Sequence, residues 1–455
     1  MSALDIEYSY RYPFASSVEL IANNGKLRLS VAEQAAQFPY FFEGTLLQPR
    51  ATAQLLNMLA KVVSTRFYIP PAMLEKMIAA RDPVITSGGG MLRFEGFSAC
   101  CSAYARVDIS PDSYRGEILG VGTTNVDFNS TMKSALSSIR DDEKIAISIG
   151  AEKMALTRGV DSIVEKKVNL PVRWLKGFVE VQSYQSSMEH RFTINKVETI
   201  RFLRSVPNRF TPRSTFWVIQ SGKGLRFSQT PVQSSVKISG LNRLLILKQL
   251  AAFADELTIF ADPRGEASEW QLRCGAITFT LSLTAESRRG FSGEGQALIA
   301  LADAPENQIA QVRACLKWQS IVSVVEISKQ TQLTEVTVRQ LLSVLGTRGL
   351  VGFDLKAGAY FHREMPFDLE RVEHMQPRLK AARLLVANGL VSVLSRNSDM
   401  NELEVRGTEV KHLVKLGQTG NRCTCQWYSK YQGLRGPCKH IIASVITLRG
   451  DDGEE

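Results

Sequence analysis

Cysteine and histidine are scarce in this sequence, with seven Cys and five His among 455 residues. The cysteines are odd in number and scattered along a long chain, which argues against the disulfide framework of secreted domains. We therefore expect a protein of the reducing cytoplasm.

Long hydrophobic runs are also missing. No stretch of about 18 consecutive apolar residues occurs, so we expect no membrane span and no membrane partner. The first residues, Met1 to Glu7, contain no basic segment followed by an apolar one, so we expect no signal peptide. Hydrophobic residues make up 44% and charged residues 22% of the chain, which is the balance of a folded protein with buried cores.

Motifs of catalysis are absent from residues 1–305. Gly88-Gly89-Gly90 is not followed by the Gly-Lys-Thr/Ser of a phosphate loop, and Ser221 to Gly224 also lacks that spacing, so both are expected to be turns. Gly290 to Gly295 misses the Gly-x-Ser-x-Gly pattern of hydrolases by one position. We expect that the protein is not an enzyme, although sequence leaves three-dimensional constellations in this region open.

Positive charge is in excess. The net charge is +10, which favours anionic partners and nucleic acid first. Residues 306–449 hold twenty Lys and Arg against twelve Asp and Glu. Residues 421–449 have no acid and five cations: Arg422, Lys430, Arg435, Lys439 and Arg449.

A cysteine and histidine pattern near the C-terminus carries the clearest chemistry. Cys423 and Cys425 lie two residues apart, and residues at this spacing face the same side of a β-strand. Cys438 and His440 have the same spacing, and they converge if Cys438 lies in the turn entering a helix and His440 in its first turn. Three thiolates and one imidazole are the ligand set of a structural zinc ion. The alternative is four unrelated residues in a C-terminal segment.

The spacing Cys-x-Cys, twelve residues, Cys-x-His resembles the SWIM zinc finger, a strand-strand-helix module. Leu403 to Gly407 and Val410 to Leu416 alternate like two strands, and Trp427 and Tyr428 are expected to continue the ligand strand. Apolar residues from Ile441 to Leu448 recur at helical spacing. The resemblance covers about residues 400–449. It implies one structural Zn²⁺ per chain, bound by Cys423, Cys425, Cys438 and His440. The remaining histidines show no metal-ligand spacing: His190, His362, His374 and His412.

Residues 306–366 predict a winged helix. Thr334 can cap a third helix whose apolar residues lie at i, i+3, i+4 and i+7, and Gly349 can end it. Leu350 to Phe353 and Ala359 to His362 then pair as the wing. In this fold the third helix enters the major groove, so Arg339 and Gln340 are candidates for base contact. Many winged helices bind proteins instead, and that alternative stays open.

The predicted fold class is an α+β multidomain protein with a mixed α/β N-terminal region, a β-rich middle domain, a winged helix and a C-terminal ββα zinc finger. In the middle region we expect strands at Val168–Val181 and Arg191–Phe202 and a helix at Leu241–Leu257; in the N-terminal region Pro71–Ala80 is expected to be helical. The expected boundaries are residues 1–165, 166–305, 306–396 (winged-helix-like), 397–449 (zinc finger) and 450–455 (an acidic disordered tail).

These features together predict a zinc protein that binds nucleic acid, DNA over RNA, through the finger and the winged helix. Arg422, Lys430, Arg435 and Lys439 are the expected phosphate contacts, because no acid in their stretch pairs with them. The chain is also similar to bacterial SWIM proteins that accompany MoxR-type AAA+ ATPases and von Willebrand factor A proteins. That resemblance implies the alternative of an adaptor or scaffold for an AAA+ ATPase without DNA contact.

Overall fold

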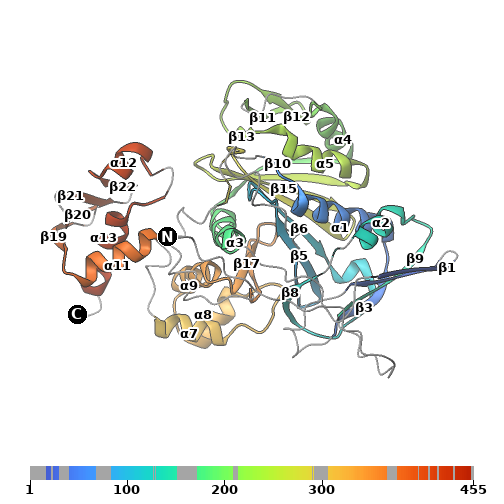
Figure 1. Cartoon of the computed structure of the whole chain (residues 1–455), viewed down its shortest axis with the longest axis horizontal. Coiled ribbons are helices and arrows are strands. Elements are labelled where there is room, and N and C mark those ends of the chain that lie inside the picture. The colour runs from blue at the N-terminus through green and yellow to red at the C-terminus, as the bar shows by residue number, and fades with distance from the viewer. Residues whose placement is uncertain are drawn as a thin grey trace.

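The structure is a computed structural model. It describes residues 17–21, 24–29, 40–67, 83–126, 128, 130–150, 172–208, 214–288, 290–291, 306–365, 377–397, 399–407, 410–417, 420–433 and 436–451. The helix expected at Pro71–Ala80 and most of the acidic tail lie outside these ranges. The described chain is a mixed α/β multidomain protein with several sheets (Figure 1).

An eight-stranded antiparallel sheet is the largest unit. Its strands, in spatial order, are β10 (Glu189–Asn195), β14 (Glu256–Ala261), β15 (Ala267–Cys274), β16 (Ile277–Thr284), β6 (Ala103–Ile109), β5 (Met91–Phe97), β4 (Val84–Gly88) and β8 (Gly122–Asn125). Strands β16 and β6 pair directly, with Phe279 opposite Val107. The boundary predicted at residue 165 therefore falls within one sheet, and we treat residues 1–305 as a single body.

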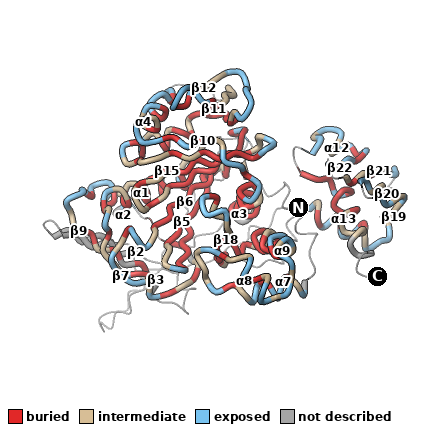
Figure 2. The backbone as a smooth tube through the Cα atoms, turned by 180° about the vertical axis from the view of Figure 1, so that it is seen from behind, coloured by how far each residue is buried: buried red, intermediate tan, exposed pale blue. Residues whose placement is uncertain are grey.

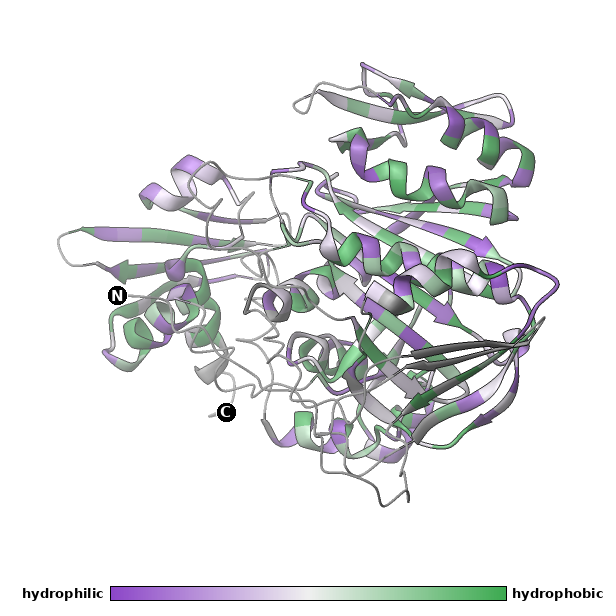
Figure 3. Cartoon of the chain, turned by 45° about the vertical axis from the view of Figure 1, so that its right-hand side comes forward, coloured by the Kyte–Doolittle hydropathy of each residue, from purple (hydrophilic) through white to green (hydrophobic). Residues whose placement is uncertain are grey.

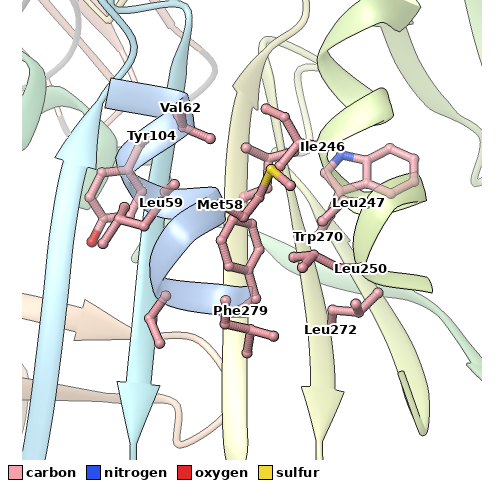
Figure 4. Close-up of a cluster of buried hydrophobic side chains, with 14 of the residues drawn as sticks. Met58, Leu59, Val62, Tyr104, Ile246, Leu247, Leu250, Trp270, Leu272 and Phe279 are labelled. Carbon is pink, nitrogen blue, oxygen red and sulfur yellow. The ribbon is translucent and has the colours of Figure 1, made fainter. Parts of the chain in front are cut away.

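One face of this sheet is apolar. Helix α1 (Pro49–Ser64) and helix α5 (Leu245–Leu250) cover it, and their side chains pack on Trp270, Leu272 and Phe279 (Figure 4). These residues belong to one hydrophobic cluster that runs through both halves of the sheet. Polar and apolar residues alternate along the strands, as expected for a sheet with two different faces (Figure 3).

The opposite face is polar and also buried. Arg93 and Glu95 on β5 and Tyr104, Arg106 and Asp108 on β6 are each at most 6% exposed. Arg93 and Arg106 both bond Asp108, at 3.0 and 2.8 Å. Because buried charges require partners, the elements that cover this face have to supply polar groups.

Helix α3 (Val172–Gln185) covers part of the polar face. The strand expected at Val168–Val181 was wrong for the described part. Its β-branched residues suggest a strand, but Trp174, Phe178 and Val181 are buried at helical spacing.

Two further expectations in the middle region were wrong in part. Residues 191–202 divide into strand β10 and helix α4 (Lys196–Ser205), whose first turn is capped by Asn195. Residues 241–257 form α5 flanked by the short 3₁₀ helices η4 (Leu241–Leu244) and η5 (Ala251–Phe253), and then strand β14 begins at Glu256.

Within residues 1–305, the described chain also contains two smaller sheets. The five-stranded sheet has the order β1 (Ser17–Ile21), β2 (Asn24–Leu29), β9 (Lys144–Gly150), β3 (Tyr40–Leu46) and β7 (Tyr114–Ile118), with η3 (Pro111–Ser113) before β7 and helix α2 (Ser130–Ser138) before β9. The three-stranded sheet has the order β12 (Gly224–Ser228), β11 (Thr215–Ser221) and β13 (Val236–Ser239). Strands β11 and β12 join at Ser221 and Gly224, which confirms the hairpin turn expected there.

A unit of three helices and a hairpin follows. It contains α7 (Glu306–Ala314), α8 (Val324–Thr331), α9 (Glu335–Thr347), β17 (Val351–Asp354) and β18 (Ala359–His362). The Thr334 hydroxyl caps α9 by accepting from the Thr337 N–H, as the sequence predicts. Gly349 follows the helix with φ of 74°.

The hairpin of this unit lies on the polar face of the large sheet. Asp354 accepts from Arg93 at 3.1 Å, and the Phe353 carbonyl accepts from Arg106 at 2.9 Å. Arg363, just after β18, pairs with buried Glu95. The Gly88-Gly89-Gly90 turn also contacts this unit. Only glycine fits at position 88, because a Cβ there would lie 2.4 Å from the Trp318 carbonyl oxygen.

The C-terminal part forms a separate module. It contains α11 (Pro377–Ala387), β19 (Val391–Arg396), β20 (Met400–Arg406), β21 (Lys411–Gly417), β22 (Gly420–Cys423), α12 (Gln426–Tyr431) and α13 (Lys439–Asp451). It has its own buried core and lies to one side of the body (Figures 1 and 2). Strand β19 pairs with β20, so the boundary predicted at residue 396 falls within one sheet. The first described element of the module is α11, which begins at Pro377.

None of the described helices is both long and apolar enough to cross a membrane.

Candidate metal centre and its basic surroundings

Cys423 and Cys425 reach the centre from two different elements. Cys423 is the last residue of β22, and Cys425 is the N-cap of α12, where its sulfur accepts the Tyr428 N–H at 3.4 Å. Trp427 and Tyr428 therefore belong to a helix, and the expectation that they continue the strand was wrong. The cap explains the difference, since a sulfur that accepts a helical N–H ends the extended backbone there.

Cys438 and His440 converge at the start of a helix. Cys438 precedes α13, and its sulfur accepts the Ile441 N–H at 3.4 Å. His440 is the second residue of α13. This is the geometry that the two-residue spacing predicts. The N–H donors and the positive end of the helix dipole both favour a thiolate at Cys438.

The four donor atoms form one buried cluster. They lie within 4.8 Å of one another, and each residue is at most 7% exposed. His440 Nδ1 is 3.8 Å from the Cys423 sulfur, so Nδ1 is the ring nitrogen that faces the thiols. Three thiols and one imidazole, closed to solvent, fit one structural Zn²⁺.

The thiols are coupled through hydrogen bonds. Bonds from Cys423 and Cys438 lower the pKa of the Cys425 thiol, and donation to Cys425 raises the pKa of Cys423. A zinc ion replaces these shared protons, because zinc binds thiolates and its binding releases protons. The three cysteines are free, and His440 adds a fourth donor atom to them, which is the arrangement of a cation site.

His412 extends the centre although its spacing gives no metal signal. Its ring lies 4.2 Å from the His440 ring, and burial together with the neighbouring His440 lowers the pKa of His412. Sequence reasoning did not find this contact, because it depends on the pairing of β20 with β21 and on the position of α13.

The cations predicted to contact phosphate are exposed around the module. Arg422 on β22, Lys430 on α12 and Lys439 on α13 are exposed, whereas Arg435 lies outside the described residues. Arg422 lies opposite Lys415 on β21. Lys415 pairs with Glu402 at 2.6 Å and Lys411 with Glu404 at 2.9 Å. Among the described residues, Arg422, Lys430 and Lys439 have no ion-pair partner.

Arg339 and Gln340 belong to another unit. Both are exposed on α9, whose core is separate from that of the metal module. Arg339 pairs with Glu335 of the same helix at 3.0 Å. The structure therefore does not place these two residues in the same site as the cations of the zinc module.

Arg378 is a residue of the centre that sequence reasoning did not assign. It lies on α11, donates to the Pro437 carbonyl at 2.7 Å, and its guanidinium carbon is 4.5 Å from the centre of the Trp427 ring. A groove of about 680 Å³ opens beside it and beside the metal ligands.

Comparison with known proteins supports the metal centre. The sequence model of the SWIM zinc finger family matches residues 412–449, which include all four ligands. No curated protein sequence matches the chain. One similar solved structure is the proliferating cellular nuclear antigen from Entamoeba histolytica, with 8% identity and a TM-score of 0.34 over 54% of this chain and 98% of that one. At this TM-score we take neither fold nor function from the similarity.

Proposed function

We propose that this protein binds nucleic acid, DNA first, through a basic module whose fold depends on one structural zinc ion. The distribution of charge carries the proposal. Residues 377–449 contain twelve Lys and Arg against four Asp and Glu, whereas residues 306–376 contain eight of each. The positive excess of the C-terminal region thus lies entirely in the zinc module. Clustered cations on one module are the electrostatic footprint of a polyanion partner.

The ion pairs of the module support the same conclusion. Glu402 and Glu404 already pair with Lys415 and Lys411 across strands β20 and β21. Arg422, Lys430 and Lys439 are left without carboxylate partners among the described residues. Exposed cations of this kind gain most from phosphate, because binding releases the counterions of the nucleic acid.

We also propose that α7, α8, α9 and the β17–β18 hairpin form a winged helix. The hairpin that corresponds to the wing lies against the large sheet, so its strands are engaged within the chain. The exposed residues Arg339 and Gln340 near the start of α9 are then the groups that can reach base edges. In this proposal the unit contributes preference for particular DNA sequences. It contributes little attraction for phosphate, because residues 306–376 hold equal numbers of basic and acidic residues.

A second candidate function is that of a protein adaptor, for which an AAA+ ATPase is the proposed partner. The observation that favours it is exposed apolar surface on the same unit. Val336 is 64% exposed, Ile321 58% and Val325 46%. Apolar side chains left in solvent are common at protein interfaces. Under this proposal residues 1–305 serve as a scaffold, and no catalytic role is assigned to them.

Electrophoretic mobility shifts with single-stranded DNA, duplex DNA and RNA test the main proposal. The zinc-loaded full chain should bind at low salt, and binding should weaken steeply as salt is raised. Protein stripped of zinc by a chelator should bind more weakly, since the module folds with its metal. Absence of binding by the zinc-loaded chain to all three probes at low salt would leave the adaptor as the better account.

A further inference from the structure

A groove beside the metal centre is formed by three helix ends. It lies between the start of α11, the start of α12 and the start of α13, next to Gly407 and Val410. Its volume is about 680 Å³. The residues that line it are Arg378, Gly407, Val410, His412, Cys425, Gln426, Trp427, Cys438, Lys439 and His440.

The two permanently charged side chains in the described lining of the groove are both cations. Arg378 and Lys439 are permanent cations on its walls, and no carboxylate is present among the described residues that line it. Lys439 is the first residue of α13, so the positive end of the helix dipole adds to its charge. An anionic oxygen is therefore the group that this groove accommodates best.

Arg378 is held in place before any ligand enters. Its guanidinium donates to the Pro437 carbonyl at 2.7 Å and lies over the Trp427 ring. A planar guanidinium held in this way loses little conformational freedom when it takes a further oxygen partner.

His440 offers one more donor at the groove wall. Its Nδ1 faces the thiols, and its Nε2 is buried without a hydrogen-bond partner among the described residues. Metal-bound histidines usually donate their second ring N–H to an acceptor. An anionic oxygen bound in the groove would be such an acceptor for the Nε2–H group.

The aromatic rings at the groove are already engaged. Trp427 has Arg378 on its ring and Tyr431 at 4.6 Å, and His412 lies on His440 at 4.2 Å. Bases of single strands are usually held on free aromatic faces. The groove is therefore suited to the phosphate backbone and not to bases.

We infer that this groove binds a backbone phosphate of the nucleic acid, with Arg378 and Lys439 as its charged contacts. The inference rests on the proposed function and goes beyond it, because Arg378 lies outside the segment that matches the SWIM family. The opposing explanation is structural: the two cations offset the thiolate charge of the zinc centre and bind no ligand.

Three variants of the full, zinc-loaded chain separate these explanations. Arg378→Gln removes one groove cation. Gln426→Glu adds a negative charge to the groove wall at the first position of α12, where an acid favours the helix. Lys380→Gln is the matched control, because Lys380 is exposed on the same helix α11 and is not a groove residue. Affinity for a fluorescent 20-base-pair duplex is measured over a salt series, with zinc content and thermal midpoint as readouts of structure.

We expect Arg378→Gln and Gln426→Glu each to weaken binding about fivefold at low salt, which is the size of one exposed charge contact. Lys380→Gln should change it less than twofold. Arg378→Gln should also lower the salt slope by about 0.9. If the Arg378→Gln variant loses zinc, the DNA affinity of the Gln426→Glu variant alone decides between the two explanations.

The inference is overturned if Gln426→Glu binds as tightly as Lys380→Gln with zinc retained. If substitution of Arg422 and Lys430, which lie outside the groove, still weakens binding in that case, the proposed function stands and only the groove assignment fails. Absence of duplex binding by the unsubstituted chain defeats both.

Discussion

Cys438 is the most deeply buried of the four metal ligands, at 1% exposure, and it joins the zinc to the start of α13. Changing Cys438 to Ser keeps a hydrogen-bond acceptor for the Ile441 N–H and removes a thiolate. We expect zinc affinity to fall by more than about 100-fold, since even partners outside the ligand set cost 10- to 100-fold.

Metal analysis and hydrogen exchange measure this effect. The core of residues 377–451 should exchange rapidly in the Cys438→Ser variant, because the metal and the module fold together. The large sheet should keep its protection, because its core is separate. Cys315→Ser, at a half-exposed thiol outside the cluster, is the control and should retain full zinc. One zinc per chain in Cys438→Ser would contradict the ligand assignment.

The four ligands could be predicted from sequence because their chemistry is local. The Cys-x-Cys and Cys-x-His spacings limit the backbone to a few conformations, and the donor types select zinc. Arg378 and His412 could not be found in this way. Their roles arise only when α11 and the β20–β21 pair pack on α13, and contacts between distant segments leave no spacing to recognise.

Under the proposed function, recognition of the DNA sequence depends on the exposed face of helix α9. Changing Arg339 to Ala should reduce the preference among DNA sequences more than it reduces overall affinity, because a bidentate base contact carries about 1–3 kcal/mol of discrimination. Glu335→Gln is the companion variant, since it releases Arg339 from its 3.0 Å ion pair and should leave preference intact or raise it. Competition binding against a randomised duplex pool measures both quantities.

A contradicting result is an Arg339→Ala variant that binds DNA with the same affinity and the same preference among sequences as the unsubstituted chain. That result would assign α9 to a protein interface. The exposed Val336 on the same helix would then be the first residue to test for partner binding.

The carboxylate of Asp354 joins the β17–β18 hairpin to the large sheet, and its charge depends on pH. Burial raises the pKa of Asp354, but the Arg106 and Arg93 guanidiniums outweigh burial and hold the pKa below its usual range. A lowered carboxyl pKa stabilises the folded state above the unfolded value of about 3.9, and that stability is lost as pH falls through the folded pKa.

Changing Asp354 to Asn should therefore lower the free energy of unfolding by about 3 kcal/mol at pH 7, because it leaves two buried guanidiniums with fewer partners. The difference from the unsubstituted chain should shrink below about pH 4. Chemical denaturation followed from pH 7 to pH 3 measures it. A difference that stays constant over this range would show that Asp354 is not the group that titrates.

Element types were predictable where the local signal was consistent. Thr334 and Gly349 mark both ends of α9, and alternation marks β5, β6 and β16. Helix α3 was not recognised because its Val and aromatic residues favour strands locally. Its helical form is selected by packing, since a Cβ at Gly177 would lie 2.9 Å from the Phe97 ring on β5.

At the scale of the whole molecule, residues 1–365 and residues 377–451 have different cores and different charge. The sequence could not show that the three-helix unit belongs to the N-terminal body, because the residues that join the two, such as Arg93 and Asp354, lie far apart in the chain. We expect a fragment of residues 377–455 to fold on addition of one equivalent of zinc and to bind duplex DNA. Circular dichroism during a zinc titration checks folding, and a fragment that stays unfolded with zinc would show that the module needs the body.

The salt dependence of duplex binding tests the central claim most directly. The full zinc-loaded chain is compared with the double variant Arg422→Gln/Lys430→Gln in the zinc module and with Lys329→Gln/Lys356→Gln, which makes the same charge change on α8 and the hairpin turn. The slope of log affinity against log salt should fall by about two in the zinc-module variant, at roughly 0.9 per phosphate contact, and should be unchanged in the other. Equal slopes in all three proteins, or a loss confined to Lys329→Gln/Lys356→Gln, would contradict the account.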